Sequence, residues 1–86
     1  MPVTQPNDTV LLVDGIIQQV NALAREVTVL VDGMEMVFDV PADCTVLLYG
    51  ERVKLRMLQP LDHAIISYSP RQSPLAARAI EVANLT

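Results

Sequence analysis

The stretch that decides the fold is Arg25-Glu-Val-Thr-Val-Leu-Val-Asp-Gly-Met-Glu-Met-Val-Phe-Asp-Val40, in which two alternating apolar runs flank Asp32-Gly33. An Asp-Gly pair suits a two-residue type I′ turn, because both central residues need a positive φ. With these residues as the loop, the register predicts three facing pairs on one side of a hairpin: Val31 with Met34, Val29 with Met36, and Val27 with Phe38. The other side carries Thr28, Leu30, Glu35 and Val37. The stretch therefore predicts a β-hairpin with one dry face, and we expect Met34, Met36 and Phe38 to line the protein interior.

Length and composition indicate one small aliphatic domain. The chain has 86 residues, of which 51% are hydrophobic and 3% aromatic. A domain of this size cannot hide so much apolar surface, so we expect an exposed apolar patch. We assign residues 10–83 to a single small β-barrel domain, residues 1–9 to a flexible N-terminal arm and residues 84–86 to a C-terminal tail.

Strand patterns recur along the rest of the chain. Residues 10–20 form a long predicted strand, in which Gly15 fits a bend and a β-bulge near Gln18-Gln19 returns Ile17 and Val20 to one face. Residues 16–27 also fit a helical period, and this alternative stays open. Further strands are expected at 45–49, 63–68 and 76–82. Residues 52–58 alternate like a strand, but they also allow one helical turn before Pro60.

The spacing of these elements indicates the fold class. Strands separated by turn signals every eight to twelve residues or so are typical of a small barrel or sandwich. Closing a barrel removes the exposed strand edges that would otherwise promote aggregation. We therefore expect an all-β fold, a small five- or six-stranded antiparallel barrel that is OB-like or SH3-like.

A series of structural motifs supports the same fold. The series consists of Gly15-x-Ile17-x-x-Val20, Val27-Thr-Val29 with Asp32-Gly33, Phe38-x-Val40, Gly50-Glu-x-Val53-x-Leu55-x-x-Leu58-x-Pro60-x-Asp62 and Ile80-x-Val82. In this order the motifs resemble a group of uncharacterised small bacterial OB-like β-barrel domains, over about residues 10–82. That group usually carries glycine at the position of Leu61, which leaves the turn type there open. The resemblance implies a fold and no particular reaction.

Charge and cysteine content argue against several classes of protein. The formal net charge of −4 disfavours an electrostatic nucleic-acid binder, which needs a basic face. Cys44 is the single cysteine of the chain, so an internal disulfide is excluded. The polar start has no signal-peptide pattern, and no apolar run approaches the roughly 20 residues of a membrane span. We expect a cytoplasmic protein, although many members of the resembling group are exported.

The sequence offers few groups for catalysis. Asp62-His63 could belong to a catalytic triad with Cys44 as the nucleophile. Cys44 has no adjacent base and no glycine-rich oxyanion loop, and free cysteines are usually small buried hydrophobes. We therefore expect a protein that is not an enzyme and needs no cofactor.

Soft metal ligands form a second candidate group. They are Met34, Met36, Cys44, Met57 and His63, which could bind copper(I). Met34 and Met36 lie two residues apart on one face, as a chelating pair would. That face is the predicted core, where methionine usually fills gaps. Copper(I) binding by Met34, Met36 and His63 is therefore a weaker alternative.

A basic stripe suggests a different alternative. Arg52, Lys54 and Arg56 alternate with apolar residues, and on an OB-like barrel they could follow a single-stranded nucleic acid with Tyr49 as a stacking platform. The simpler interpretation is a solvated face opposite acidic side chains, which the net charge favours. A nucleic-acid partner is therefore the second choice.

The excess of apolar residues motivates the leading functional hypothesis. Several of them fall outside the predicted core and are candidates for an interface: Leu11, Leu30, Val37, Leu47 and Ile65. Together with the missing catalytic groups, they favour a protein–protein interaction or assembly module. We expect a protein partner, as a homo-oligomer or as an accessory subunit.

Overall fold

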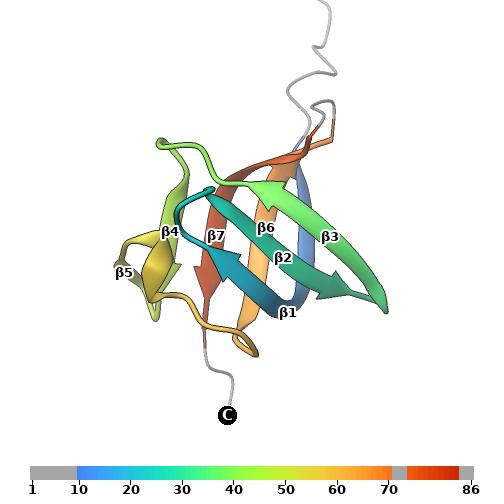
Figure 1. The fold of residues 1–86 in the computed structure, drawn as a ribbon, viewed down its shortest axis with the longest axis horizontal. Coiled ribbons are helices and arrows are strands. Elements are labelled where there is room, and N and C mark those ends of the chain that lie inside the picture. Colours follow the sequence, from blue (N-terminus) through green and yellow to red (C-terminus); the bar gives the residue numbers. More distant parts are fainter. Residues whose placement is uncertain (1–9, 71–73, 84–86) are drawn as a thin grey trace, which may run out of the picture.

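The computed structural model describes residues 10–70 and 74–83, and these form a small all-β barrel (Figure 1). The strands are β1 (Leu11–Asn21), β2 (Glu26–Val31), β3 (Met34–Asp39), β4 (Thr45–Leu48), β5 (Glu51–Arg52), β6 (His63–Ser69) and β7 (Ala76–Val82). A short 3₁₀ helix, η2 (Leu55–Met57), lies between β5 and β6. The expected fold class is confirmed. The predicted N-terminal arm and C-terminal tail lie outside the described residues.

The β2–β3 hairpin has the predicted register. Val31 pairs with Met34, Val29 with Met36 and Val27 with Phe38. The two loop residues, Asp32 and Gly33, have φ values of 51° and 81°, as a type I′ turn requires. The turn chemistry and the period of two therefore determine this part of the fold locally.

Strand β1 is strongly bent and belongs to two parts of the sheet. Its first half pairs with β6 and its second half with β2, with a register shift between Ile17 and Gln19. This confirms the predicted bulge and rules out the helical alternative for residues 16–27. A side chain at Gly15 would meet the Leu30 carbonyl oxygen at 2.5 Å and a Val29 methyl at 2.6 Å. Glycine is therefore needed where β2 crosses close to β1.

The strand order is β3-β2-β1-β6-β7-β4-β5, and a bridge between Asp39 of β3 and Ala76 of β7 closes the ring. Strand β4 runs parallel to β7, so one edge of the barrel departs from the expected antiparallel order. The expected strand at 52–58 is also shorter than its alternating pattern indicated. After Arg52 the chain turns into η2, because Leu55 and Leu58 are three residues apart and both bury their side chains.

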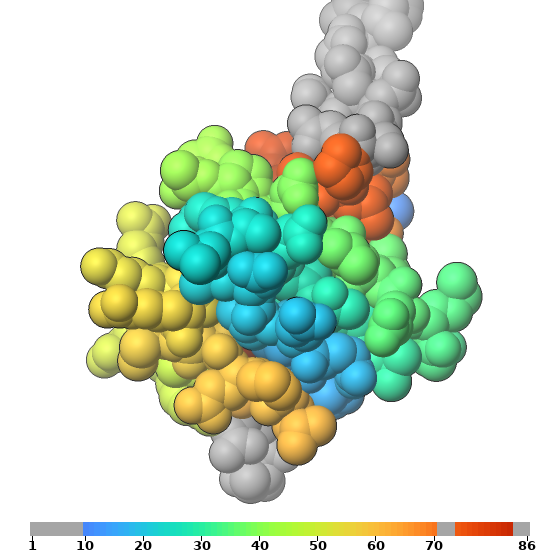
Figure 2. Space-filling view, viewed as in Figure 1, coloured from blue at the N-terminus to red at the C-terminus, as the bar shows by residue number. Residues whose placement is uncertain are grey.

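The core lies between the β1–β3 half and the β6–β7 half of the barrel. Its largest fully buried side chains are Phe38, Ile17, Ile66, Ile80, Val27, Val29, Val40 and Val82. The prediction that Met34 lines the interior is wrong, because its side chain is 69% exposed. Strand β3 pairs with β7 at Asp39, the last residue of β3. The first residues of β3, which include Met34, therefore have β2 as a neighbour on one side and, within the described residues, no paired strand on the other. The tip of the hairpin stands out from the barrel (Figure 2).

Candidate functional site

Two methionines share one face of the hairpin, close to its tip. Met34 lies across from Val31 and Met36 across from Val29, so both thioethers are on the inward-facing side of β3. Met36 is half-buried against the core, whereas Met34 is exposed. Alternate residues of a strand lie about 6.6 Å apart, and the three rotatable bonds of each methionine allow both sulfur atoms to reach one ion. The structure therefore leaves the methionine pair accessible to a ligand.

His63 does not join the two methionines. It pairs with Ile16 on the outer face of the barrel, and Ile16 in turn pairs with Leu30 of β2. The ring Nε2 of His63 contacts the Asp14 carboxylate across the β1–β6 pair. The predicted ligand set of Met34, Met36 and His63 is therefore corrected to the two methionines, because His63 faces the other side of the sheet.

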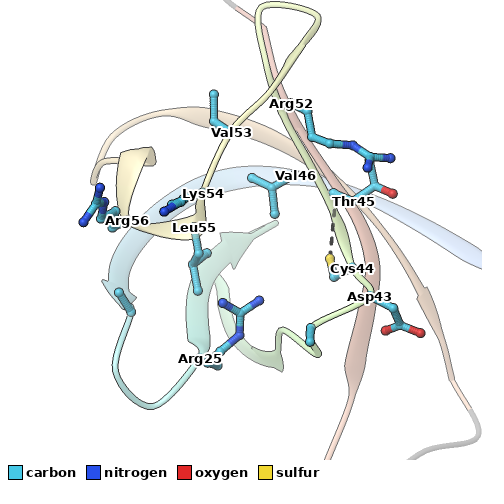
Figure 3. A pocket seen from close by; sticks show the side chains of 12 residues that line it. Arg25, Asp43, Cys44, Thr45, Val46, Arg52, Val53, Lys54, Leu55 and Arg56 are labelled. Carbon is cyan, nitrogen blue, oxygen red and sulfur yellow. Dashed lines mark hydrogen bonds between the residues drawn. The ribbon is translucent and has the colours of Figure 1, made fainter.

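A concave pocket gathers most of the positive charge of the described residues (Figure 3). Its volume is about 500 Å³. The basic side chains that line it are Arg25, Arg52, Lys54 and Arg56. They come from the β1–β2 turn, from β5, from the residue before η2 and from η2 itself. The three residues of the predicted basic stripe are neighbours along residues 52–56, and the tertiary fold adds Arg25 from a distant turn.

Arg25 was missed by the sequence reasoning. It has a φ of 56° at the end of the β1–β2 turn, directly before β2. Its guanidinium group donates from Nε to the Val40 carbonyl at 2.8 Å and from Nη2 to the Pro41 carbonyl at 3.3 Å. These bonds hold the guanidinium at the pocket. The pattern of the sequence alone contains no signal for them, since the partners are 15 and 16 residues away.

Cys44 lines the same pocket as an un-ionised thiol. Burial raises its pKa from the ordinary 9.0 to about 11, with Arg25 opposing this shift and Asp43 adding to it. Its Sγ donates to the Thr45 carbonyl at 3.6 Å. A thiol is a poor nucleophile compared with a thiolate, so this environment does not activate Cys44.

The other groups considered for catalysis do not assemble around Cys44. The Asp62 carboxylate accepts a hydrogen bond from the Gln59 backbone N–H at 3.0 Å, which closes the turn around Pro60. His63 interacts with Asp14 and not with Asp62. Tyr49, at the β4–β5 turn, is 60% exposed and does not line the pocket. The basic pocket therefore lacks the aromatic platform of the nucleic-acid alternative.

Two of the candidate interface residues, Leu47 and Ile65, lie on either side of Glu81 in one cross-strand row, and the other three lie on other strands. Val37, Leu11 and Ile65 are exposed, whereas Leu30 and Leu47 are half-buried. Leu30 and Val37 are on the outer face of the hairpin, Leu47 is on β4, Ile65 is on β6 and Leu11 begins β1. They do not follow one strand or one strand pair.

Two further findings concern membranes and harder metal ions. None of the helices in residues 10–70 and 74–83 is long and apolar enough to cross a membrane. Within the same residues, no group of three or more His, Cys, Asp or Glu side chains is placed to hold a metal ion.

The barrel is similar to solved structures of one metal-binding protein. No protein-family model and no curated protein matches the sequence. The crystal structure of Ag(I)CusF superposes with a TM-score of 0.70 at 13% identity, covering 87% of this chain and 99% of that one. A tryptophan-to-alanine variant of Escherichia coli CusF with Cu(II) covers 96% of this chain and 100% of that one, at 14% identity and a TM-score of 0.70. The apo form of CusF from the same organism superposes with a TM-score of 0.69 at 13% identity.

These likenesses confirm the OB-like small barrel expected from the motifs, although they identify no family. They contradict the leading functional hypothesis. The proteins of the same shape are described by the silver or copper that they hold, and not by assembly with other proteins. The interpretation as a protein–protein interaction module, based on the apolar excess, is therefore wrong.

Proposed function

We propose that this protein binds a soft metal ion, Cu(I) or Ag(I), through the thioethers of Met34 and Met36. The observation that carries the proposal is their placement on one face of β3, with Met34 exposed at the hairpin tip. Thioether sulfur is a soft ligand that selects Cu(I) over harder ions. The similarity of the fold to silver- and copper-bound CusF supports the same conclusion.

The sequence predicted that Met34 and Met36 are both buried, whereas Met34 is exposed in the structure. Two buried methionines would fill space in the core and would not be open to a metal ion. Their expected burial was therefore the reason to disfavour a metal site. Exposure of Met34 removes that argument, while Met36 remains anchored against the core. An anchored ligand next to an exposed one lets an ion enter from solvent without opening the barrel.

We further infer that the role is binding without catalysis. Support comes from the raised pKa of Cys44 and from the separation of His63 from it on the barrel. Catalysis by a nucleophile needs a base within hydrogen-bond reach, and Cys44 donates instead to its neighbour's carbonyl.

The test is a titration with Ag(I), and with Cu(I) under reducing conditions, followed by native mass spectrometry and thermal unfolding. We expect one ion per chain and a higher melting temperature. The double variant Met34→Leu/Met36→Leu should lose both effects, because leucine keeps the size and removes the sulfur. Met57→Leu is the matched control, since Met57 is a half-exposed methionine on η2. Equal binding by the double variant, or no binding by the native chain, would overturn the proposal.

A further inference from the structure

The basic pocket concentrates positive charge on an acidic protein. The chain has six Lys and Arg residues against ten Asp and Glu, with a net charge of −4. Four of those six cations line the pocket, and Asp43 is the one carboxylate in its lining. Like charges placed together repel one another and weaken the folded state. A bound anion would reduce this repulsion between the four cations and so stabilise the folded protein.

The four cations are not neutralised within the described structure. In residues 10–70 and 74–83 the one contact within 4.0 Å between a basic and an acidic side chain is that of His63 with Asp14, which lies on the outer face of the barrel. Arg25 uses two of its five N–H donors on the Val40 and Pro41 carbonyls. Those bonds orient the guanidinium before any ligand arrives. The side chain therefore loses less conformational entropy when a ligand binds.

The shape and lining of the pocket suit a small ligand. Its volume of about 500 Å³ falls within the range of roughly 300–1,000 Å³ that is usual for small-molecule sites. In the close view, Arg52 and Arg56 extend to opposite sides of the pocket with Lys54 between them, and the Arg25 guanidinium rises from the opposite wall toward Leu55 (Figure 3). Val46, Val53 and Leu55 supply apolar wall between the charges. The pocket thus combines anion-binding groups with apolar surface.

We propose that this pocket binds a small molecule that carries a phosphate or diphosphate group. Guanidinium groups match phosphate oxygens in a two-pronged geometry, and the lysine ammonium adds a compact charge beside them. The apolar wall is where the organic part of such a molecule would rest. This assignment differs from a nucleic-acid groove because Arg25 adds a cation from the opposite wall of the pocket and no aromatic side chain of the described residues lines it.

The phosphate pocket is separate from the methionine pair. Arg25 directly precedes the first residue of β2, whereas Met34 follows the turn after its last residue. A strand of six residues spans roughly 20 Å, so the two sites lie at opposite ends of β2. Loss of soft-metal binding in Met34→Leu/Met36→Leu would therefore leave phosphate binding unchanged.

The experiment uses inorganic pyrophosphate as the probe, in calorimetric titrations at low and at physiological salt. We expect saturable binding of one pyrophosphate per chain that weakens as salt rises. The double variant Arg52→Gln/Lys54→Gln should bind about tenfold more weakly, because two charge-assisted contacts are lost. Arg78→Gln, which removes an exposed cation of β7 outside the pocket, should bind like the native protein. Both replaced pocket residues are exposed, so the variants should fold, and thermal unfolding checks this.

Cys44 offers a second readout at the same place. Because it is the single cysteine and lines the pocket, bound pyrophosphate should slow its alkylation in the native chain and not in Arg52→Gln/Lys54→Gln. Three results would overturn the proposal. One is no binding up to millimolar pyrophosphate at low salt. Another is equal loss of affinity in Arg78→Gln and in the pocket variant. The third is tighter binding of a mixed-sequence single-stranded oligonucleotide than of pyrophosphate at equal salt.

Discussion

The ring of Phe38 on β3 meets the ring of Tyr68 on β6 edge to face, with centroids 5.1 Å apart and an interplanar angle of 62°. The two strands are not neighbours in the sheet, so this contact spans the barrel interior. Such a pair contributes beyond the area that it buries. Replacing Phe38 by leucine should lower the free energy of unfolding by about 1–2 kcal/mol, through lost volume and the lost ring contact. Chemical denaturation measures this.

The control for that experiment is Tyr68→Phe, which keeps the ring pair and removes the hydroxyl group. It should change the free energy of unfolding by less than about 0.5 kcal/mol, in the range of mildly tolerated substitutions. Equal stability of Phe38→Leu and the native chain would show that the ring pair does not hold the two halves of the barrel together.

Gly15 allows β2 to pass close to β1, and alanine at this position should destabilise the barrel. Its Cβ would meet the Leu30 carbonyl oxygen at 2.5 Å, and backbone cannot move aside as a flexible side chain can. We expect Gly15→Ala to lower the free energy of unfolding by about 2 kcal/mol or more. Gly33→Ala meets no atom within 4 Å but has a φ of 81°, so it should lose only about 1 kcal/mol through backbone strain. The reverse order of the two variants would contradict the close approach.

Leu61 occupies a left-handed conformation with a φ of 77°, and its side chain is 81% exposed. The turn thus keeps the conformation that suits glycine, although this chain has leucine there. The left-handed region costs a non-glycine residue about 1–2 kcal/mol, and glycine loses about 0.5–1 kcal/mol more backbone entropy on folding. Leu61→Gly should therefore raise the free energy of unfolding by up to about 1 kcal/mol. Leu61→Ala should give no such gain, because alanine keeps the strain.

Ag(I) should protect the methionine pair from oxidation. Peroxide oxidises exposed methionine to its sulfoxide, and a sulfur atom bound to a metal ion has its lone pair engaged. In the absence of metal, Met34 should react faster than Met36, because Met36 is half-buried. Peptide mass spectrometry should show that Ag(I) slows both, while Met57 reacts as before. Unchanged oxidation of Met34 with Ag(I) present would count against the metal site.

The raised pKa of Cys44 makes stability depend on pH on the alkaline side. Since the folded thiol holds its proton up to about pH 11 and an ordinary thiol only to 9.0, the folded chain binds more protons than the unfolded chain between these values. This contribution to stability is complete below pH 9.0 and is lost as the pH rises toward about 11. Denaturation across this range should show a smaller loss of stability in Cys44→Ala. Native alkylation should also reach half of its maximal rate near pH 11.

Much of the local structure follows from short patterns in the sequence. Asp32-Gly33 with alternating flanks predicts both the turn and the register of the hairpin, because turn geometry and strand period act over a few residues. The bulge after Ile17 follows from the same period of two. The pattern at 52–58 was ambiguous because alternation and a spacing of three coexist there, and burial of Leu55 and Leu58 favoured the 3₁₀ turn.

The candidate sites were less predictable because they depend on contacts between distant segments. The proposed methionine pair follows from its spacing in the sequence. Its exposure depends on the tertiary structure, because β7 pairs with β3 at Asp39 and not along the first residues of β3. The sequence allowed His63 as a third ligand, but the pairing of β1 with β6 places it on the outer face next to Asp14. Arg25 joins the pocket through carbonyl groups 15 and 16 residues away, which no local pattern encodes.

The sequence by itself determined the β class, the hairpin register, the bulge and the residues able to bind a soft ion, since these depend on local turn chemistry and alternation. Only the tertiary structure decided which of these residues reach solvent and which charges come together. The fold leaves Met34 exposed at the hairpin tip, away from the bridge between β3 and β7, and it brings Arg25 to the pocket that Arg52, Lys54 and Arg56 also line. Strand pairing and burial join residues that are distant along the chain. The environment of both sites therefore depends on the tertiary structure and cannot be derived from local sequence patterns.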